Sequence, residues 1–133
     1  MKSSRNEPEF VYSVEEVAAK SKILAAFVAE RELLNANVDA ADNALLKRFY
    51  NIDHNTYLNG ALGAAQKELQ GLAVSAALRC DDCINYHILQ AYRLGCSRAE
   101  LEETLNVSLV VGGSIVIPHL RRAYAVLTEL YGS

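Results

Sequence analysis

The strongest constraint on the fold is a helix-start signal that occurs twice in the sequence. Ser13 is followed three residues later by Glu16, and Ser97 by Glu100, and apolar residues at helical spacing follow each pair. In such a capping box the serine side chain accepts a hydrogen bond from the backbone N–H of the glutamate, and the glutamate side chain accepts one from the serine. No segment shows the sustained alternation of apolar and polar residues that predicts a strand. The sequence therefore predicts an all-α fold.

About six helices are expected. The periodic segments are a helix beginning at Ser13, a set of apolar residues over 38–49, and helices over 59–78, over 82–94, from Ser97 onward and over 120–131. The polar segment 50–57 is expected to interrupt the pattern, and Gly95 stands where a helix commonly ends in a glycine. Pro118 is expected to open or kink the last helix. We predict a flexible N-terminal arm over 1–12 and a single helical domain over 13–133.

Length and charge narrow the class of protein. A chain of 133 residues with 51% hydrophobic and 22% charged residues has enough apolar side chains for one packed domain. The net charge is −3 and the longest basic run is Arg121-Arg122, so no nucleic-acid partner is expected. The first ten residues lack an apolar signal segment, and the apolar runs are too short for a membrane span. We therefore expect a cytoplasmic protein with no membrane partner.

A cysteine pair followed by a histidine is the strongest chemical motif. Cys80, Cys83 and His87 form the pattern C-x-x-C-x-x-x-H, which on one helix places all three within an arc of about 60°. Cys83 and His87 are then about 6 Å apart along the helix axis. A helix N-terminus favours a thiolate, and His87 can exchange a proton with it. Asp81 and Asp82 oppose the thiolate through their charge.

The motif leaves other interpretations open. Cysteines in a cytoplasmic protein are usually reduced, so a close pair is more often catalytic or metal-binding than a structural disulfide. Zinc would use Cys80, Cys83 and His87, with Glu68 or His119 as a fourth ligand. A thioredoxin-type site requires the motif to follow a strand, whereas helical patterns surround it here. In a third interpretation the cysteines and the histidine are ordinary core residues.

The wider pattern around the motif is similar to a known family. Glu68 precedes Cys80 by twelve positions, and after His87 come a helix start of the form G-x-S-x-x-E and a glycine pair. The segment of about 65–125 resembles the carboxymuconolactone decarboxylase family, in particular its AhpD-like (alkylhydroperoxidase) branch. The matching positions are Glu68, Cys80, Cys83, His87, Gly95, Ser97, Glu100, Gly112 and Gly113. The chain departs from the longer AhpD proteins in Asp81-Asp82 and in its short N-terminal half.

This resemblance implies a fold, an activity and an assembly. It implies an AhpD-like helical subunit with the cysteine pair at a helix N-terminus, in a trimer or hexamer. It implies a thiol-dependent peroxidase or disulfide oxidoreductase without a metal or an organic cofactor, whose partners are a peroxide and a dithiol or thiol-protein reductant. By position, Cys83 would be the peroxidatic thiol and Cys80 the resolving one, with Glu68 and His87 in a proton relay. Family members named for lactone decarboxylation generally lack this cysteine pair.

Two alternatives to the peroxidase remain at this point. One is a lyase or isomerase acting on a small carboxylated metabolite, with His87 or His119 as the base. The other is an oligomeric protein with a vestigial site. We interpret Cys96, beside a helix cap, as structural, and leave open whether His119 lines the pocket of the cysteines.

The distance between Glu68 and the cysteines raises a geometric question. On one straight helix Glu68 and Cys80 would be about 18 Å and about 120° apart. Two arrangements could bring Glu68 to a cysteine pair. In the first, the chain folds back between the two positions. In the second, Glu68 serves the site of a neighbouring subunit.

Overall fold

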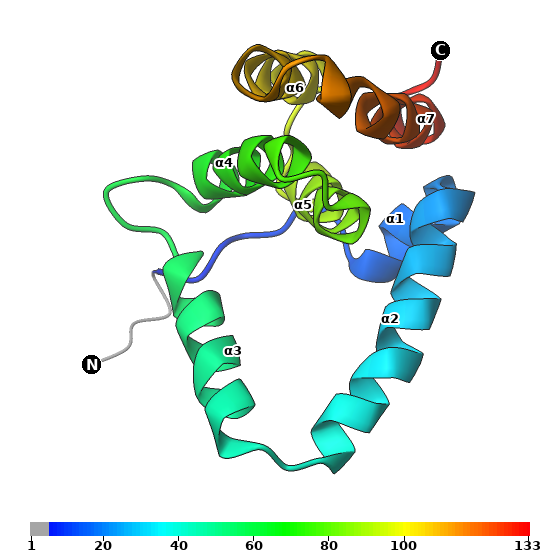
Figure 1. Cartoon of the computed structure of the whole chain (residues 1–133). Helices are drawn as coiled ribbons and strands as arrows, with labels where there is room; N and C mark the ends of the chain where they lie inside the picture. Colours follow the sequence, from blue (N-terminus) through cyan, green and yellow to red (C-terminus); the bar gives the residue numbers. More distant parts are fainter. Residues whose placement is uncertain (1–5) are drawn as a thin grey trace.

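A computed structural model describes residues 6–133, and these form seven α-helices and one short 3-10 helix, with no strand among them (Figure 1). The all-α prediction is confirmed. Residues 1–5 of the expected arm lie outside the described residues. The helices are α1 (Val14–Lys20), α2 (Lys22–Ala40), α3 (Ala44–Thr56), α4 (Ala64–Ala77), α5 (Asp81–Arg93), α6 (Arg98–Gly112), the 3-10 helix η2 (Ser114–Val116) and α7 (Ile117–Tyr131).

Both predicted capping boxes are present. The backbone N–H of Glu16 donates to Ser13 Oγ over 3.0 Å, and the N–H of Ser13 donates to Glu16 Oε1 over 2.8 Å. The pair Ser97 and Glu100 forms the same two bonds at the start of α6. Gly95, with φ of +87°, follows the end of α5 as predicted. The N-terminal ends of α1 and α6 were thus readable from the sequence.

Three predicted boundaries are wrong. The apolar set over 38–49 does not lie on one helix, because α2 ends at Ala40 and α3 begins at Ala44. The polar segment 50–57 does not interrupt the helical pattern, because α3 continues through it to Thr56. No residue of α3 is buried, so its polar side chains face solvent without breaking the helix. The helix expected from residue 59 begins at Ala64 instead, since Asn59 accepts a hydrogen bond from the Ala64 N–H with its side chain over 2.7 Å. Gly63 is the N-cap residue there.

The core lies between three layers of helices. In Figure 1, α4 and α5 are central, α6 and α7 cover one side, and α1 with the first half of α2 covers another. None of the helices within 6–133 is both long and apolar enough to cross a membrane. The fully buried side chains come from all three layers and include Val17, Leu24, Leu72, Ile88, Leu101, Leu105, Val116, Val126 and Leu127.

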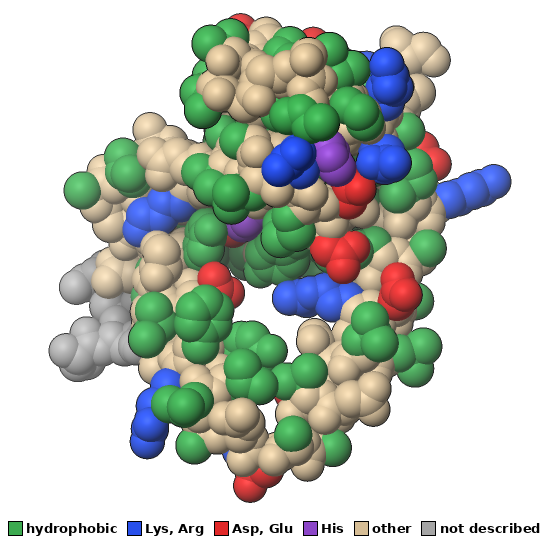
Figure 2. Space-filling model, in the orientation of Figure 1, with side chains coloured by type: hydrophobic (Ala, Val, Ile, Leu, Met, Phe, Trp, Pro, Cys, Tyr) green, Lys and Arg blue, Asp and Glu red, His purple; other side chains and the backbone are tan. Residues whose placement is uncertain are grey.

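The second half of α2 and the whole of α3 extend away from this core (Figure 1). They carry large hydrophobic side chains that are 38–74% exposed: Leu33, Leu34, Leu45, Leu46, Phe49, Tyr50 and Ile52. We call these seven residues the apolar arm. Figure 2 shows hydrophobic side chains along both helices and an opening between them below α5. An isolated helix of 13 residues is marginal in water, so an arm of this kind is suited to packing against a further surface.

The N-terminal segment is held against the helical body. The backbone N–H of Val11 donates to the carbonyl of Arg93 over 2.7 Å, and the N–H of Asn59 donates to the carbonyl of Asn6 over 2.7 Å. The Arg93 guanidinium lies 3.8 Å from the centre of the Phe10 ring. Residues 6–12 therefore connect the end of α5 with the loop before α4.

Candidate active site

A sharp turn between α4 and α5 creates the site. α4 ends in a Schellman motif, in which Arg79 N–H donates to the Ala76 carbonyl over 3.0 Å and Cys80 N–H donates to the Ser75 carbonyl over 3.1 Å. Arg79 has φ of +62°, a left-handed conformation that usually selects glycine. The turn reverses the chain, so α5 packs along α4. Of the two arrangements considered for Glu68, the chain adopts the fold-back.

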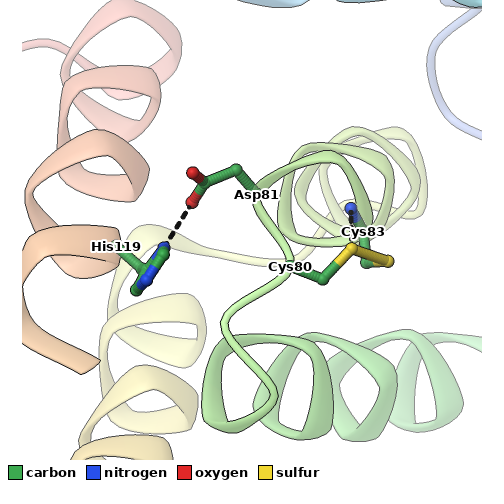
Figure 3. The surroundings of a disulfide bond; sticks show 4 residues. All are labelled: Cys80, Asp81, Cys83 and His119. Atoms are coloured by element: carbon green, nitrogen blue, oxygen red, sulfur yellow. Dashed lines mark hydrogen bonds and ion pairs between the residues drawn. A yellow bond between two sulfur atoms is a disulfide. The ribbon is translucent and has the colours of Figure 1, made fainter. Parts of the chain in front are cut away.

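The cysteine pair lies at the N-terminus of α5 and forms a disulfide (Figure 3). Cys80 is the N-cap residue, and its Sγ accepts a hydrogen bond from the Cys83 N–H over 3.2 Å. The two Cα atoms are 5.2 Å apart, within the usual range for a disulfide. Cys83 is exposed, whereas Cys80 is half-buried. An incoming molecule therefore reaches Cys83 more easily.

Glu68 and His87 form a buried pair beside the cysteines. Glu68 Oε1 lies 2.7 Å from His87 Nδ1, and the two residues are only 3% and 9% exposed. They come from α4 and α5, which the turn at Arg79 brings together. Because the carboxylate occupies Nδ1, the other ring nitrogen, Nε2, is the one left for exchanging a proton with a ligand.

Three neighbours of His87 were not identified from the sequence. The rings of Tyr57 and Tyr86 lie 5.7 Å and 5.3 Å from its ring. Gly71, one helical turn after Glu68 on α4, faces the imidazole directly, since a Cβ there would lie 2.5 Å from Cε1. Two signals were available: Tyr86 directly precedes His87 in the sequence, and Glu68 and Gly71, three residues apart, share a helix face.

Cys83 and His87 line the same open cavity of about 360 Å³. Its wall comes from α2, α3 and α5: Phe27, Glu30, Arg31, Leu34, Asn35, Asp53, Asp82, Cys83, Tyr86 and His87. Three carboxylates and one guanidinium therefore line the cavity that Cys83 shares. The Arg31 guanidinium lies 4.8 Å from the centre of the Tyr86 ring, so a cation–π contact holds it.

The two tyrosines near His87 remain protonated at neutral pH. Burial, and next the charge of Glu68, raise the pKa of Tyr86 above its ordinary value. The same two causes, in the same order, raise the pKa of Tyr57. Both phenols can thus donate hydrogen bonds near the site without adding negative charge.

His119 lies outside the cavity of Cys83 and forms a separate cluster with Asp81 (Figure 3). His119 Nδ1 is 2.8 Å from Asp81 Oδ1, and Arg122 Nη1 donates to Asp81 Oδ2 over 3.1 Å. The sequence left open whether His119 lines the pocket. In the structure His119 contacts Asp81, the first residue of α5, instead.

The third cysteine is remote from this chemistry. Cys96 is only 6% exposed and packs in the hydrophobic core. Burial, followed by the charges of Glu100 and Glu68, raises the pKa of its thiol to about 11. A thiol of this kind is unreactive at neutral pH, in agreement with its structural interpretation.

The described residues do not form the set of zinc ligands that was considered from the sequence. Within residues 6–133, no three His, Cys, Asp or Glu side chains are grouped so that they could hold a metal ion. His119, considered as a fourth ligand, is turned to Asp81.

Comparison with known proteins gives consistent matches. A model of the carboxymuconolactone decarboxylase family matches residues 43–128. An uncharacterized protein of Cupriavidus necator is 31% identical over 90 residues, which cover 68% of this chain and 80% of the relative. An uncharacterized protein from the cox locus of Paracoccus denitrificans is 29% identical over 108 residues, covering 81% of this chain and 91% of the relative.

Solved structures extend the comparison to the fold. A crystal structure of a protein of this family from Thermotoga maritima, to which a possible involvement in the antioxidative response is attributed, is 50% identical with a TM-score of 0.74. The match covers 79% of this chain and 89% of that protein. A family protein from Legionella pneumophila, in its apo form, is 25% identical with a TM-score of 0.71, and the match covers 85% of this chain and all of that protein.

Proposed function

Since the chain belongs to the carboxymuconolactone decarboxylase family, we propose that it is a thiol-dependent peroxidase that reduces peroxides through its Cys80–Cys83 pair. The observation that supports this most strongly is the exposed Cys83 in one cavity with His87, whose ring is fixed by the buried Glu68. A disulfide to Cys80 is the expected product of such a thiol. The antioxidative involvement attributed to the Thermotoga maritima relative agrees with this proposal.

The oxidative half of the reaction begins at Cys83. Its thiolate attacks one peroxide oxygen, the O–O bond breaks, and the sulfur becomes a sulfenic acid. The departing alkoxide or hydroxide takes a proton from Nε2 of a protonated His87. Glu68, hydrogen-bonded to Nδ1, stabilises the charged imidazolium and fixes its orientation.

The disulfide then forms and is reduced again. The Cys80 thiolate attacks the sulfenic sulfur of Cys83, and the hydroxyl group leaves as water after receiving a proton. A dithiol reductant, either a small molecule or a thiol protein, attacks the disulfide and leaves with its own two sulfurs joined. In total one organic hydroperoxide and one dithiol yield one alcohol, one water and one oxidised dithiol, and with hydrogen peroxide a second water takes the place of the alcohol. The cycle requires neither a metal nor an organic cofactor.

The charge of the cavity argues against a lyase that acts on a carboxylated metabolite. Among the residues that the structure describes, Glu30, Asp53 and Asp82 line it together with one cation, Arg31. A carboxylated substrate would meet net repulsion there, whereas hydrogen peroxide or a neutral organic hydroperoxide would not.

We further propose that the chain works as a homo-oligomer, a trimer or a hexamer. The apolar arm exposes seven large hydrophobic side chains that the subunit itself does not cover. Monomeric soluble proteins seldom expose large apolar surfaces. A second copy of the chain would cover it without requiring another gene product.

Peroxide consumption with a supplied dithiol tests the proposed reaction. Cys83→Ser is expected to lower turnover to the uncatalysed rate, because no other exposed thiol can attack the peroxide. When the dithiol is left out, Cys80→Ser is expected to consume one equivalent of peroxide and then stop, with Cys83 trapped as a sulfenic acid that dimedone labels. Mass spectrometry of the wild type after one equivalent of peroxide should show the Cys80–Cys83 disulfide.

Cys96→Ala is the matched control, since it removes the third thiol outside the cavity. It should leave turnover within about twofold of the wild type. Wild-type turnover in the Cys83→Ser variant would refute the proposed reaction. The same follows if peroxide leaves both thiols of the pair free.

A further inference from the structure

The sequence of the cysteine motif contains an apparent conflict. Asp81 and Asp82 lie between the two cysteines, and negative charge beside a thiol disfavours the thiolate that the proposed reaction requires. The structure separates the two aspartates. Asp82 is exposed and lines the cavity together with Cys83, whereas Asp81 lies outside that cavity.

Both carboxylate oxygens of Asp81 are engaged by α7. Oδ1 lies 2.8 Å from His119 Nδ1, and Oδ2 accepts from Arg122 Nη1 over 3.1 Å. In Figure 3 the Asp81 side chain points toward His119, while the Cys80 side chain points in the opposite direction toward Cys83. The carboxylate of Asp81 is therefore turned away from the disulfide.

The two partners of Asp81 share one face of α7. His119 and Arg122 are three residues apart, so both side chains reach the N-terminus of α5 from the same side. The His119 side chain is only 19% exposed, and α7 packs directly on α5. Packing thus limits how far the imidazole can move from the carboxylate. The Arg122 side chain is 63% exposed and adds its charge from the solvent side.

We propose that His119 and Arg122 are positioning residues for the cysteine pair: by binding both oxygens of Asp81, they hold this carboxylate away from the sulfurs of Cys80 and Cys83. This inference rests on the proposed thiol chemistry and adds two residues of α7 to it. Without them, Asp81 is free to rotate toward the cysteines, and its unpaired charge opposes the thiolate.

Variants at Asp81, His119 and Arg122 leave the other charged groups around the two cysteines unchanged. They are Arg79, which precedes Cys80, and the cavity residues Glu30, Arg31, Asp53 and Asp82, together with the Glu68–His87 pair. Differences between variants at positions 81, 119 and 122 therefore report on the Asp81 cluster.

Alkylation of the reduced protein by iodoacetamide tests the proposal without peroxide. Mass spectrometry would give the rate of Cys83 modification as a function of pH in the wild type and in the double variant His119→Gln/Arg122→Gln. At neutral pH the double variant is expected to react about threefold to tenfold more slowly, the effect of one screened charge near the thiol. Its pH profile should move toward higher pH.

A variant at Asp81 provides the decisive comparison. If His119 and Arg122 act through Asp81, the same two substitutions should change the rate by less than about twofold once Asp81→Asn is present. Arg122→Lys, which keeps the cation, should restore most of the rate lost in Arg122→Gln. Thermal unfolding of each variant shows whether the fold persists.

Asp82→Asn is the matched control, because it removes the neighbouring carboxylate that has no partner on α7. It should speed the alkylation of Cys83 in every background by a similar factor. An unchanged rate in the double variant, or an equal loss with and without Asp81→Asn, would overturn the proposal. Failure of the peroxide assay alone would instead refute the proposed reaction and leave this positioning intact.

Discussion

At the scale of single residues, burial separates the three cysteines into two kinds. Cys80 and Cys83 lie at a helix N-terminus next to an open cavity, where a thiolate is favoured and a ligand can approach. Cys96 lies in the hydrophobic core, and its thiol pKa is raised to about 11. The same side chain is therefore reactive at one site and inert at the other.

A pH titration of Cys96 tests this difference. In the variant Cys80→Ser/Cys83→Ser, Cys96 is the only thiol, and its ultraviolet thiolate absorbance should rise with a midpoint near pH 11 rather than near its ordinary 9.0. In the unfolded chain the thiol loses its proton first, so the unfolded state binds fewer protons between these two values. The free energy of unfolding should consequently fall as pH rises through that interval.

Adding Cys96→Ala to this variant serves as the control: it keeps the absorbance change of the seven tyrosines, so the difference between the two titrations is the thiolate signal. Part of the decline in stability should remain, because burial also raises the pKa of Tyr131, which bonds the Cys96 carbonyl. A thiolate midpoint near 9 in the folded protein would contradict the burial of Cys96.

At the scale of elements, α4 and α5 end in the same Schellman motif built from different residues. After α5 the left-handed position is Gly95, and after α4 it is Arg79, with φ of +87° and +62°. The N–H groups of Gly95 and Cys96 donate to the carbonyls of Tyr92 and Ala91, in the pattern also found at Arg79 and Cys80. Only the motif at Arg79 leads directly into the pair Cys80 and Cys83.

Single substitutions at these two positions should change the free energy of unfolding in different directions. Gly95→Ala forces a Cβ into a left-handed conformation and should lower the free energy of unfolding by about 1 kcal/mol. Arg79→Gly relieves that strain but adds backbone entropy to the unfolded chain, so it should be neutral or stabilising by up to about 1 kcal/mol. Urea unfolding followed by circular dichroism measures both changes.

Arg79→Val is the informative control, because a β-branched residue tolerates this conformation poorly. It should destabilise the protein more than Gly95→Ala does. If Arg79→Gly were instead the most destabilising variant, the arginine side chain would have to make a contact that the backbone conformation does not account for.

The contrast between Gly95 and Arg79 also shows what the sequence can and cannot predict. Capping boxes and a glycine after a helix are local signals, so the ends of α1, α5 and α6 could be read directly. The turn at Arg79 has no such signal, and this turn brings Glu68 to His87. The motif identified the candidate residues, but their contacts depend on packing between α4 and α5.

The polar segment 50–57 shows a second reason why the sequence could not predict the whole fold. Hydrophobic periodicity identifies helices that pack on the core of their own subunit. Helix α3 has no buried residue, so its polar positions resemble a loop in sequence. The cluster of Asp81, His119 and Arg122 joins helices distant in sequence, which no local pattern records.

At the scale of the whole molecule, the apolar arm is one hydrophobic surface that the subunit leaves uncovered. Phe49 and Ile52 are both 62% exposed on α3. Replacing both by Glu should place charge in the proposed subunit contact and weaken assembly by at least about 10²-fold, given the loss of about 1.5–3 kcal/mol for each buried side chain. Light scattering after size-exclusion chromatography would show a smaller particle.

Asn51→Glu is the matched control, since it adds a negative charge to the same helix at an exposed polar position. It should leave the particle size unchanged. A monomeric wild-type protein at micromolar concentration would rule out the proposed oligomer, and an unchanged particle in Phe49→Glu/Ile52→Glu would rule out the arm as its contact.

The two helices that carry the apolar arm also form part of the wall of the Cys83 cavity, through Leu34 and Asn35 on α2 and Asp53 on α3. Those wall residues lie on α3 and on the second half of α2, which contain no buried residue, whereas Cys83 and His87 lie on a helix packed in the interior. Dissociation of the proposed oligomer on dilution would therefore affect the wall formed by α2 and α3 more than the wall formed by α5. As copies separate, the reacting groups would keep their geometry while the surface that admits the peroxide loosened. An assay across protein concentrations would see this as a rising KM at a nearly constant kcat.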